Sequence, residues 1–376
     1  MKNFLFAVAV LMSTIVGVGI FGLPYSGAQS GFLIAAIFLI ILTGVMVLIH
    51  LLYGEIVSRT KEKHRLVGYA EYYLGKLGKI IVSFSIIIGF YGSLLIYIII
   101  GGNFLNTIFS PVINIPPIVF NLIFFTIGII AVYFGLKLIA ELDILMGIFL
   151  ILIVFLFLYF GFSHIDVNNL KLINFKNLFF PYGAILYSLA GIAAIPEIEE
   201  FFSQNGKFYK RTIILGTIIP AILYFVFMVT VIGLTGTNTS PEAIKGLVGF
   251  MGNKVIFLGA VFGFFATITS FFILGLSLKK TLWYDFKINK NLAWFLVCVI
   301  PLMLFILGLQ SFIPVIILLG SLLGLVEGTA IILIHKKAKK FGNKVPIYSL
   351  KAPDILRYLI ILMFILGFIC SLIIII

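Results

Sequence analysis

The stretch STIVGVGIFGLPY, residues 13–25, places three glycines and a proline inside the first long apolar run of the chain. Its first two glycines form a Gly-x-Gly pair, which by itself is typical of closely packed membrane helices. A third glycine and Pro24 follow within two turns, and Pro24 lacks a backbone donor and crowds the carbonyl of Ile20. We therefore expect this helix to unwind over its glycines, residues 17–22.

The composition defines the class of protein in which this broken helix sits. The 376 residues are 62% hydrophobic and only 10% charged, which no water-soluble domain of this size matches. Apolar runs of about 20 residues recur, and each is long enough to cross a hydrocarbon core of about 30 Å as a helix. The strands of a membrane β-barrel would be about half as long and would alternate polar with apolar residues. The sequence therefore predicts an all-α polytopic membrane protein.

Eleven membrane spans are predicted, and no soluble domain interrupts them, so residues 1–376 form a single transmembrane domain. The two cysteines lie inside apolar runs and imply neither a disulfide framework nor a metal site. The predicted spans are 4–28, 32–56, 79–107, 117–138, 141–162, 181–203, 212–234, 254–280, 292–308, 312–334 and 354–374.

The basic residues predict the orientation. Of the 26 lysines and arginines, 22 fall on the side of the N-terminus when the spans are counted alternately, and Lys171, Lys176, Lys245 and Lys254 fall on the other side. By the positive-inside rule the N-terminus is cytoplasmic and the C-terminus is outside a plasma membrane. The net charge of +13 comes from short blocks between apolar runs, so we expect no nucleic acid partner.

The first segment also resembles a signal peptide, because an SGA triplet at residues 26–28 follows its apolar run. The run is longer than a typical signal core. We therefore expect the segment to be retained as the first span.

A second interruption, YSLAGIAAIPEIEE at residues 187–200, lies in the sixth span. Spans one and six are the first members of two successive groups of five, and an odd number of helices inverts the second group in the membrane. Paired breaks at equivalent positions indicate the central site of a transporter. We predict a 5+5 inverted repeat, with repeat one at 4–162, repeat two at 181–334 and an extra helix at 354–374.

GVGIFGLP in the first span and YSLAGIAAIPE in the sixth resemble the amino acid-polyamine-organocation superfamily of transporters. Within it the chain is most similar to the short eleven-span amino acid permeases, which include the aromatic amino acid permease and amino acid/auxin permease groups. The resemblance implies a leucine-transporter-like fold with broken first and sixth helices. It also implies secondary active transport of an amino acid by alternating access.

A broken helix exposes backbone N–H and carbonyl groups, which lipid cannot satisfy, so these groups must line a cavity or a ligand. N–H groups at the start of a half-helix favour a carboxylate, and carbonyls at the end of one favour an ammonium group. A zwitterion fits such a site. The predicted donors are Val18, Gly19 and Ile20, and the second break contributes Tyr187, Ser188, Ala190 and Gly191.

Aromatic and hydroxyl side chains extend the predicted site. The resemblance implies that Tyr187 covers the bound substrate, although a packing role is the alternative. Gly89, Ser93 and Tyr97 share one face of span three, as a pocket wall or as a packing seam. No charged residue falls at the expected midplane of spans one, three, six or eight. The substrate we expect is a neutral apolar or aromatic amino acid.

A coupling cation is the other expected ligand, and no further cofactor is expected. Span eight contains Ala266, Thr269 and Ser270 about one turn apart, and their oxygens suit sodium together with the carbonyls of Ser13 and Val16. The alternative is that these hydroxyls bond to carbonyls of their own helices.

Protons are the other candidate ion. The fifth span has no basic residue over 144–160, which weakens proton coupling through a lysine there. Glu327 is the alternative proton relay, because it shares a helix face with Gly320 and Gly324 and points into the bundle. The alternatives for Glu327 are a structural partner within the bundle and a position near the membrane interface.

Other functions have little support in the sequence. The four histidines are scattered, and neither a zinc-protease motif nor a phosphate-binding loop is present, so an enzyme is not expected. An ion channel and an amino acid sensor or exchanger are the rival functions. Four acidic residues near the cytoplasmic boundary are either gate ion pairs or solvated helix ends: Glu55, Glu197, Glu199 and Glu200.

Overall fold

The computed structural model describes residues 2–134, 139–202 and 208–375, which contain helices and no strand. The helices are α1 (Lys2–Ile15), α2 (Gly19–Ser30), α3 (Phe32–Arg59), α4 (Leu66–Leu74), α5 (Lys76–Phe109), α6 (Pro117–Phe134), α7 (Ile139–Gly161), α8 (Phe180–Ser188), α9 (Ile195–Glu200), α10 (Tyr209–Thr235), α11 (Val248–Lys280), α12 (Lys290–Ile306), α13 (Phe312–Leu323), α14 (Thr329–Phe341) and α15 (Asp354–Ile375).

The predicted all-α membrane fold is confirmed. Among the described residues, eight helical segments are long and apolar enough to cross a bilayer, or nine if the bent pair α1–α2 counts as one span. α7 and the shorter α12 lie over the two remaining predicted spans. Residues 135–138 and 203, at the ends of two predicted spans, and Lys137 and Lys207 of the charge analysis lie outside the described residues.

Both predicted helix breaks are present. α1 and α2 meet at an angle of 56°. The second break separates α8 from a short 3₁₀ turn, η4 (Ile192–Ala194), which leads into α9. Pro196 lies in the first turn of α9, where a missing N–H costs no helical hydrogen bond.

The first break is shorter than the sequence predicts. The backbone is non-helical only at residues 16–18, so the expected unwinding over 17–22 is wrong for 19–22. Gly22 instead lets the ring of Phe312 approach to 3.1 Å from the position that a Cβ would take. Pro24 is buried inside α2, where its missing donor removes one hydrogen bond without ending the helix.

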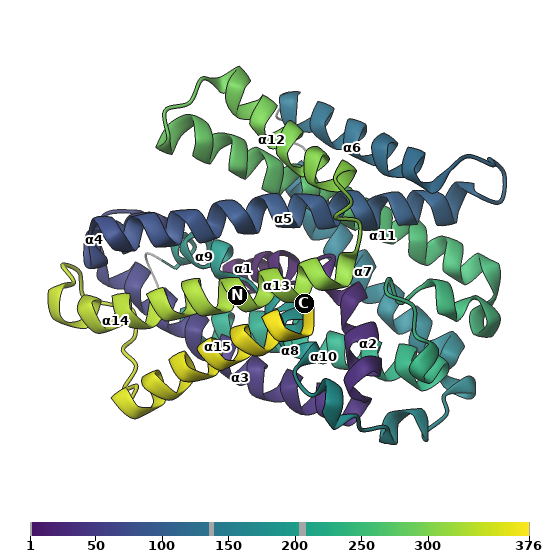
Figure 1. Ribbon diagram of the computed structural model, residues 1–376. Helices are drawn as coiled ribbons and strands as arrows, with labels where there is room; N and C mark the ends of the chain where they lie inside the picture. Colours follow the sequence, from purple (N-terminus) through teal and green to yellow (C-terminus); the bar gives the residue numbers. More distant parts are fainter. Residues whose placement is uncertain (1, 135–138, 203–207, 376) are drawn as a thin grey trace.

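The broken helices lie at the centre of the bundle (Figure 1). α1 packs against α10, α2 packs against α8 and α10, and α3 also packs against α10. α5 and α11, with 34 and 33 residues, are the longest helices among the described residues, and they pack against each other. They lie over spans three and eight, the two longest of the predicted ranges. α6 and α12 flank α5 and expose large apolar side chains, as lipid-facing helices do.

The helix pair α8 and α13 packs with backbone against backbone. A Cβ at Gly320 of α13 would collide with the carbonyl oxygen of Gly183 on α8, and a Cβ at Gly183 would collide with the carbonyl of Ile317. Small residues allow this approach, as is common between membrane helices. The contact holds the half-helix before the second break at a fixed position.

We expect Gly320→Ala to destabilise the protein by about 3 kcal/mol or more, because the added methyl group must displace backbone rather than a side chain. The apparent melting temperature in detergent measures this loss. Gly44→Ala is the control, since Gly44 is exposed on α3 and no atom lies within 4 Å of its Cβ position. Equal melting temperatures for the two variants would contradict the close α8–α13 contact.

Candidate substrate site at the two helix breaks

The first break presents unpaired backbone donors. The N–H groups of Gly17, Val18 and Gly19 donate to no backbone acceptor among the described residues. The N–H of Ile20, the third predicted donor, bonds instead to the carbonyl of Gly17 at 3.3 Å. The free donors therefore lie one residue earlier than predicted, at the N-terminus of α2, where the helix dipole adds positive potential.

The carbonyl ends of the two half-helices meet at one tyrosine. The hydroxyl oxygen of Tyr224, on α10, lies 2.7 Å from the carbonyl oxygen of Ile15 and 2.8 Å from that of Ser188. Its single proton is shared between these two acceptors, and the residue is fully buried. Tyr224 thus joins the end of α1 to the end of α8.

Sequence reasoning missed Tyr224. The residue lies inside the apolar run 212–234, where it looks like one more membrane aromatic. The sequence offered one indication: a tyrosine hydroxyl buried in a membrane span needs a hydrogen-bond partner. Which carbonyls supply that partner depends on how helices distant in sequence pack.

Three side chains of the predicted site lie together. The Tyr187 hydroxyl donates to Ser93 Oγ at 2.9 Å, and a further side-chain hydrogen bond links Tyr187 to Tyr97. These contacts join α8 to α5 beside the second break. The Ser188 hydroxyl bonds within its own helix to Ala184, and the N–H of Ala190 bonds to the carbonyl of Tyr187 at 3.2 Å.

The glycines of the breaks have different neighbours. A Cβ on Gly19 would meet the backbone and hydroxyl of Ser188, so this glycine lets the two broken helices touch. A Cβ on Gly191 would meet the side chain of Ile15 at 2.6 Å. At Gly17 no atom lies within 4 Å of the Cβ position, and Thr14, one turn earlier on α1, is exposed. Open space at the break therefore adjoins Gly17, whereas Gly19 faces protein.

The predicted sodium ligands remain in two separate groups. On α11 the Thr269 hydroxyl bonds to the carbonyl of Ala266 at 3.1 Å, and Ser270 is half-buried. On α1 the Ser13 hydroxyl bonds to Val10, while the carbonyls of Ser13 and Val16 accept no backbone hydrogen bond in the described chain. Between the described parts of these two groups there is no hydrogen bond.

Glu327 lies in a π-helical turn, η9 (Gly324–Gly328), between α13 and α14. Such turns are frequent at functional sites. The carboxylate is partly buried and forms no hydrogen bond or ion pair with the described residues. Gly324 and Gly328 on either side of it pack against Leu186 and Phe364.

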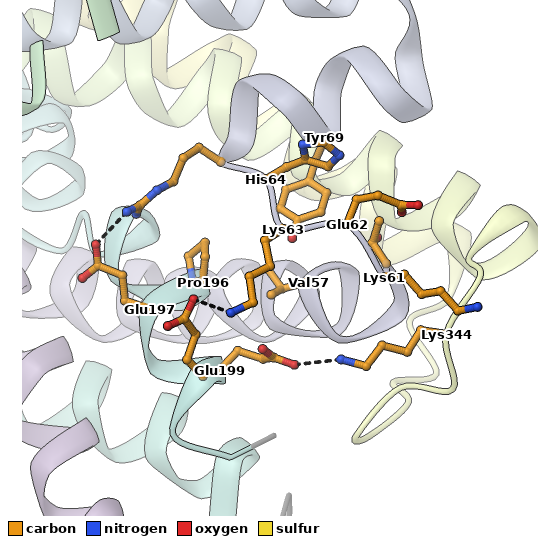
Figure 2. A pocket seen from close by; sticks show the side chains of 13 residues that line it. Val57, Lys61, Glu62, Lys63, His64, Tyr69, Pro196, Glu197, Glu199 and Lys344 are labelled. Carbon is orange, nitrogen blue, oxygen red and sulfur yellow. Dashed lines mark hydrogen bonds and ion pairs between the residues drawn. The ribbon is translucent and has the colours of Figure 1, made fainter. Parts of the chain in front are cut away.

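Three ion pairs lie at the predicted cytoplasmic end of α9, the helix that follows the second break. Lys63 and Arg65, in the turn between α3 and α4, pair with Glu200 and Glu197 of α9 at 2.8 and 2.9 Å. The hydrogen bond to Glu200 raises the pKa of Lys63. Figure 2 shows these side chains around a polar pocket of about 190 Å³, which a third pair, Lys344 with Glu199, also borders. The acidic residues of α9 are therefore ion-paired, which was one of the two predictions.

Glu55 has a different environment. Its side chain is fully buried and accepts hydrogen bonds from Arg59 at 2.8 Å and from the N–H of Leu350 at 2.7 Å. His335 Nε2 lies 3.0 Å from the second carboxylate oxygen. Because Arg357 can only donate, its contact with His335 Nδ1 places the histidine proton on Nε2, facing Glu55. Glu55 thus ties α3 to α14 and to the loop before α15.

An all-helical membrane bundle whose two half-helix pairs meet at its centre, with unpaired donors there, has the architecture of a secondary transporter. The comparison with protein families agrees with this class: the tryptophan/tyrosine permease family matches residues 1–371. The chain belongs to this family of amino acid transporters and is not an enzyme.

Two curated relatives align over most of the chain. Glutamine transporter 2 of Aliivibrio fischeri (strain ATCC 700601 / ES114) is 26% identical over 310 residues, which cover 80% of each protein. Tyrosine-specific transport system 1 of Haemophilus influenzae (strain ATCC 51907 / DSM 11121 / KW20 / Rd) is 24% identical over 286 residues, covering 72% of this chain and 70% of the relative.

Solved structures confirm the fold class. MhsT in complex with L-phenylalanine superposes with a TM-score of 0.65 at 16% identity, over 97% of this chain and 98% of its own. Mhp1 is a nucleobase-cation-symport-1 family transporter whose structure was solved in a closed conformation with bromovinylhydantoin bound. It superposes with a TM-score of 0.62 at 14% identity, over 98% of this chain and 90% of its own.

We expect Tyr224→Phe to lower both stability and substrate affinity. The variant leaves the carbonyls of Ile15 and Ser188 buried without their donor, which costs about 1–3 kcal/mol for an unsatisfied group. Melting temperature and amino acid binding in detergent measure the two effects. Tyr91→Phe is the matched control, because the Tyr91 hydroxyl forms no hydrogen bond with described residues. Identical behaviour of both variants would contradict the bridging role.

Gly17→Leu should block the site without disturbing the fold. The leucine side chain enters the open space at the first break, where the substrate would bind. Overpacking of this kind costs about 1–3 kcal/mol, and when this cost falls on substrate binding, amino acid uptake falls by about tenfold or more. The melting temperature stays within a few degrees of the wild-type value. Gly44→Leu on the exposed face of α3 is the control. Normal uptake by Gly17→Leu would place the substrate elsewhere.

Proposed function

We propose that this chain imports a neutral apolar or aromatic amino acid together with a cation, by alternating access around the two helix breaks. Within the amino acid-polyamine-organocation superfamily, we assign it beside the aromatic amino acid permease and amino acid/auxin permease groups. The observation that carries the proposal is the set of N–H groups at Gly17, Val18 and Gly19 that have no backbone acceptor and lie beside the open space at Gly17.

The neutral lining supports the class of substrate. Ser93, Tyr97 and Tyr187 offer hydroxyl groups and aromatic surface, and none of the predicted substrate residues carries a charge. The side chain of an arginine or a polyamine would find no carboxylate among them. The named relatives act on glutamine and tyrosine, and the solved MhsT complex holds L-phenylalanine, which are all neutral amino acids.

We base the membrane orientation and the division into two repeats on the sequence. The N-terminus is cytoplasmic and the C-terminus lies outside the plasma membrane, as the charge distribution predicts. We assign residues 4–162 and 181–334 to two inverted repeats, and the presence of one break in each, in α1–α2 and in α8–α9, supports this division. α15 is the additional helix.

Two ions are candidates for coupling. Sodium would use the oxygens of Ala266, Thr269 and Ser270 with the free carbonyls of Ser13 and Val16, once α1 and α11 approach each other. A proton would use Glu327, whose carboxylate has no partner among the described residues.

The decisive experiment is uptake by the full-length protein in liposomes. We expect accumulation of a radiolabelled apolar or aromatic amino acid when sodium or protons run inward, with each gradient applied separately. An ion channel would instead show steady ion conductance and no uptake of any amino acid under either gradient, and this result would overturn the proposal.

The sodium site has its own test. If sodium drives uptake, the double variant Thr269→Ala/Ser270→Ala should lose the sodium dependence. Each lost oxygen ligand costs about 1–3 kcal/mol, so sodium binding weakens by about tenfold or more. Thr126→Ala is the control, because Thr126 is exposed on α6 and bonds only to its own helix. An unchanged sodium dependence in the double variant would place the ion elsewhere.

A further inference from the structure

A buried histidine that no prediction from the sequence assigned lies next to the second break. His50 of α3 is fully buried, and its Nδ1 lies 2.9 Å from Thr217 Oγ1 of α10. Its other ring nitrogen, Nε2, has no hydrogen-bond partner among the described residues. A buried polar atom without a partner is costly and rare, so it calls for a function.

The hydrogen bonds determine which nitrogen of His50 is protonated. The Thr217 hydroxyl donates its only proton to the carbonyl of Ile213 at 2.9 Å. The Thr217 oxygen therefore accepts from His50, and Nδ1 carries the proton of the neutral imidazole. Nε2 is left with a free lone pair, the form of histidine that takes up a proton.

The imidazole ring of His50 lies against the second break. His50 Cε1, the carbon bonded to both ring nitrogens, lies 3.2 Å from the position of a Cβ on Gly191. Gly191 separates α8 from η4, and Ile15 at the end of α1 adjoins the same position. His50 is therefore in contact with the segment at which both broken helices meet.

The other ionisable groups near α3 do not bond to His50. Several of them have partners of their own: Glu197, Glu199 and Glu200 pair with Arg65, Lys344 and Lys63, and His335 faces Glu55. The elements that pack against α3 carry these titratable and charged residues: Tyr25 on α2; Lys171 on the turn Asn169–Lys171; Tyr182 and Tyr187 on α8; Glu197, Glu199 and Glu200 on α9; Tyr209, Lys210, Arg211 and Tyr224 on α10; His335, Lys336, Lys337, Lys339 and Lys340 on α14.

We propose that His50 Nε2 binds a proton that moves with the amino acid. Protonation makes Nε2–H a donor and gives the buried ring a positive charge that no bonded carboxylate offsets. A substrate carboxylate at the first break supplies that negative charge, so the proton and the amino acid each strengthen the binding of the other. This inference rests on the proposed function, and it makes His50, rather than Glu327, the proton site.

The test compares two kinds of transport by the reconstituted full-length protein. His50→Asn keeps a donor near Nδ1 for Thr217 and removes the titratable nitrogen. We expect accumulation driven by a pH gradient to fall by about tenfold or more, a coupling in the range usual for linked sites. Amino acid counterflow without a gradient, measured at saturating substrate, stays within about twofold. His164→Asn, on an exposed histidine in the loop after α7, should change neither.

Unchanged pH-driven accumulation in His50→Asn would overturn the inference, and so would loss of that accumulation in Glu327→Gln alone. A second measurement needs no variant: amino acid binding to the wild-type protein in weakly buffered detergent solution should take up protons from the medium. Binding without proton uptake contradicts the His50 site but leaves the proposed function intact. Absence of any amino acid counterflow or binding in the wild type contradicts the proposed function itself.

Discussion

The structure depends on one constraint, which is that backbone polar groups inside a membrane must find partners. A helix satisfies them internally, and each break releases N–H groups at the start of one segment and carbonyls at the end of another. The hydroxyl of Tyr224 satisfies one carbonyl from each broken span, those of Ile15 and Ser188, at 2.7 and 2.8 Å. The donors at Gly17, Val18 and Gly19 are left free of backbone acceptors. One carbonyl of each broken span is thus held by protein, and the donor side is available to a carboxylate.

The same junction is connected to the predicted cytoplasmic end through α9, which is only six residues long. α9 begins beside the second break and carries Glu197 and Glu200, which pair with Arg65 and Lys63. Arg65 also donates to the carbonyl of Ala193 at 3.1 Å, within the 3₁₀ turn that starts α9. These pairs are exposed, so each contributes little to stability and can exchange with water at small cost. α9 is therefore held by weak exposed pairs at one end and by the second break at the other.

Much of the fold follows from the sequence, because a bilayer imposes a simple length and polarity on every helix. The all-helical membrane fold, the two broken helices and the long spans three and eight were predicted from apolar runs and from glycine and proline. Of the eleven predicted spans, the described residues show up to nine that are long and apolar enough to cross a bilayer. Tyr187, Ser93 and Tyr97 were each assigned to the site from the sequence, but the hydrogen bonds that join them were not predicted. The length of the first break was overestimated, because Gly22 serves packing and Pro24 is tolerated within α2. Tyr224, His50 and the Glu55–His335 contact could not be predicted, since each joins helices far apart in sequence and depends on how those helices rotate and pack.

The central claim is that an amino acid binds at the first break with its carboxylate on the backbone of α2. An experimental structure of the protein with a bound aromatic amino acid tests this most directly. We expect the carboxylate oxygens within hydrogen-bond distance of the N–H groups of residues 17–19, and the side chain in the open space beside Gly17. Density for the ligand only in the charged pocket between the α3–α4 turn and α9, with the groups at residues 17–19 unoccupied, would contradict the claim.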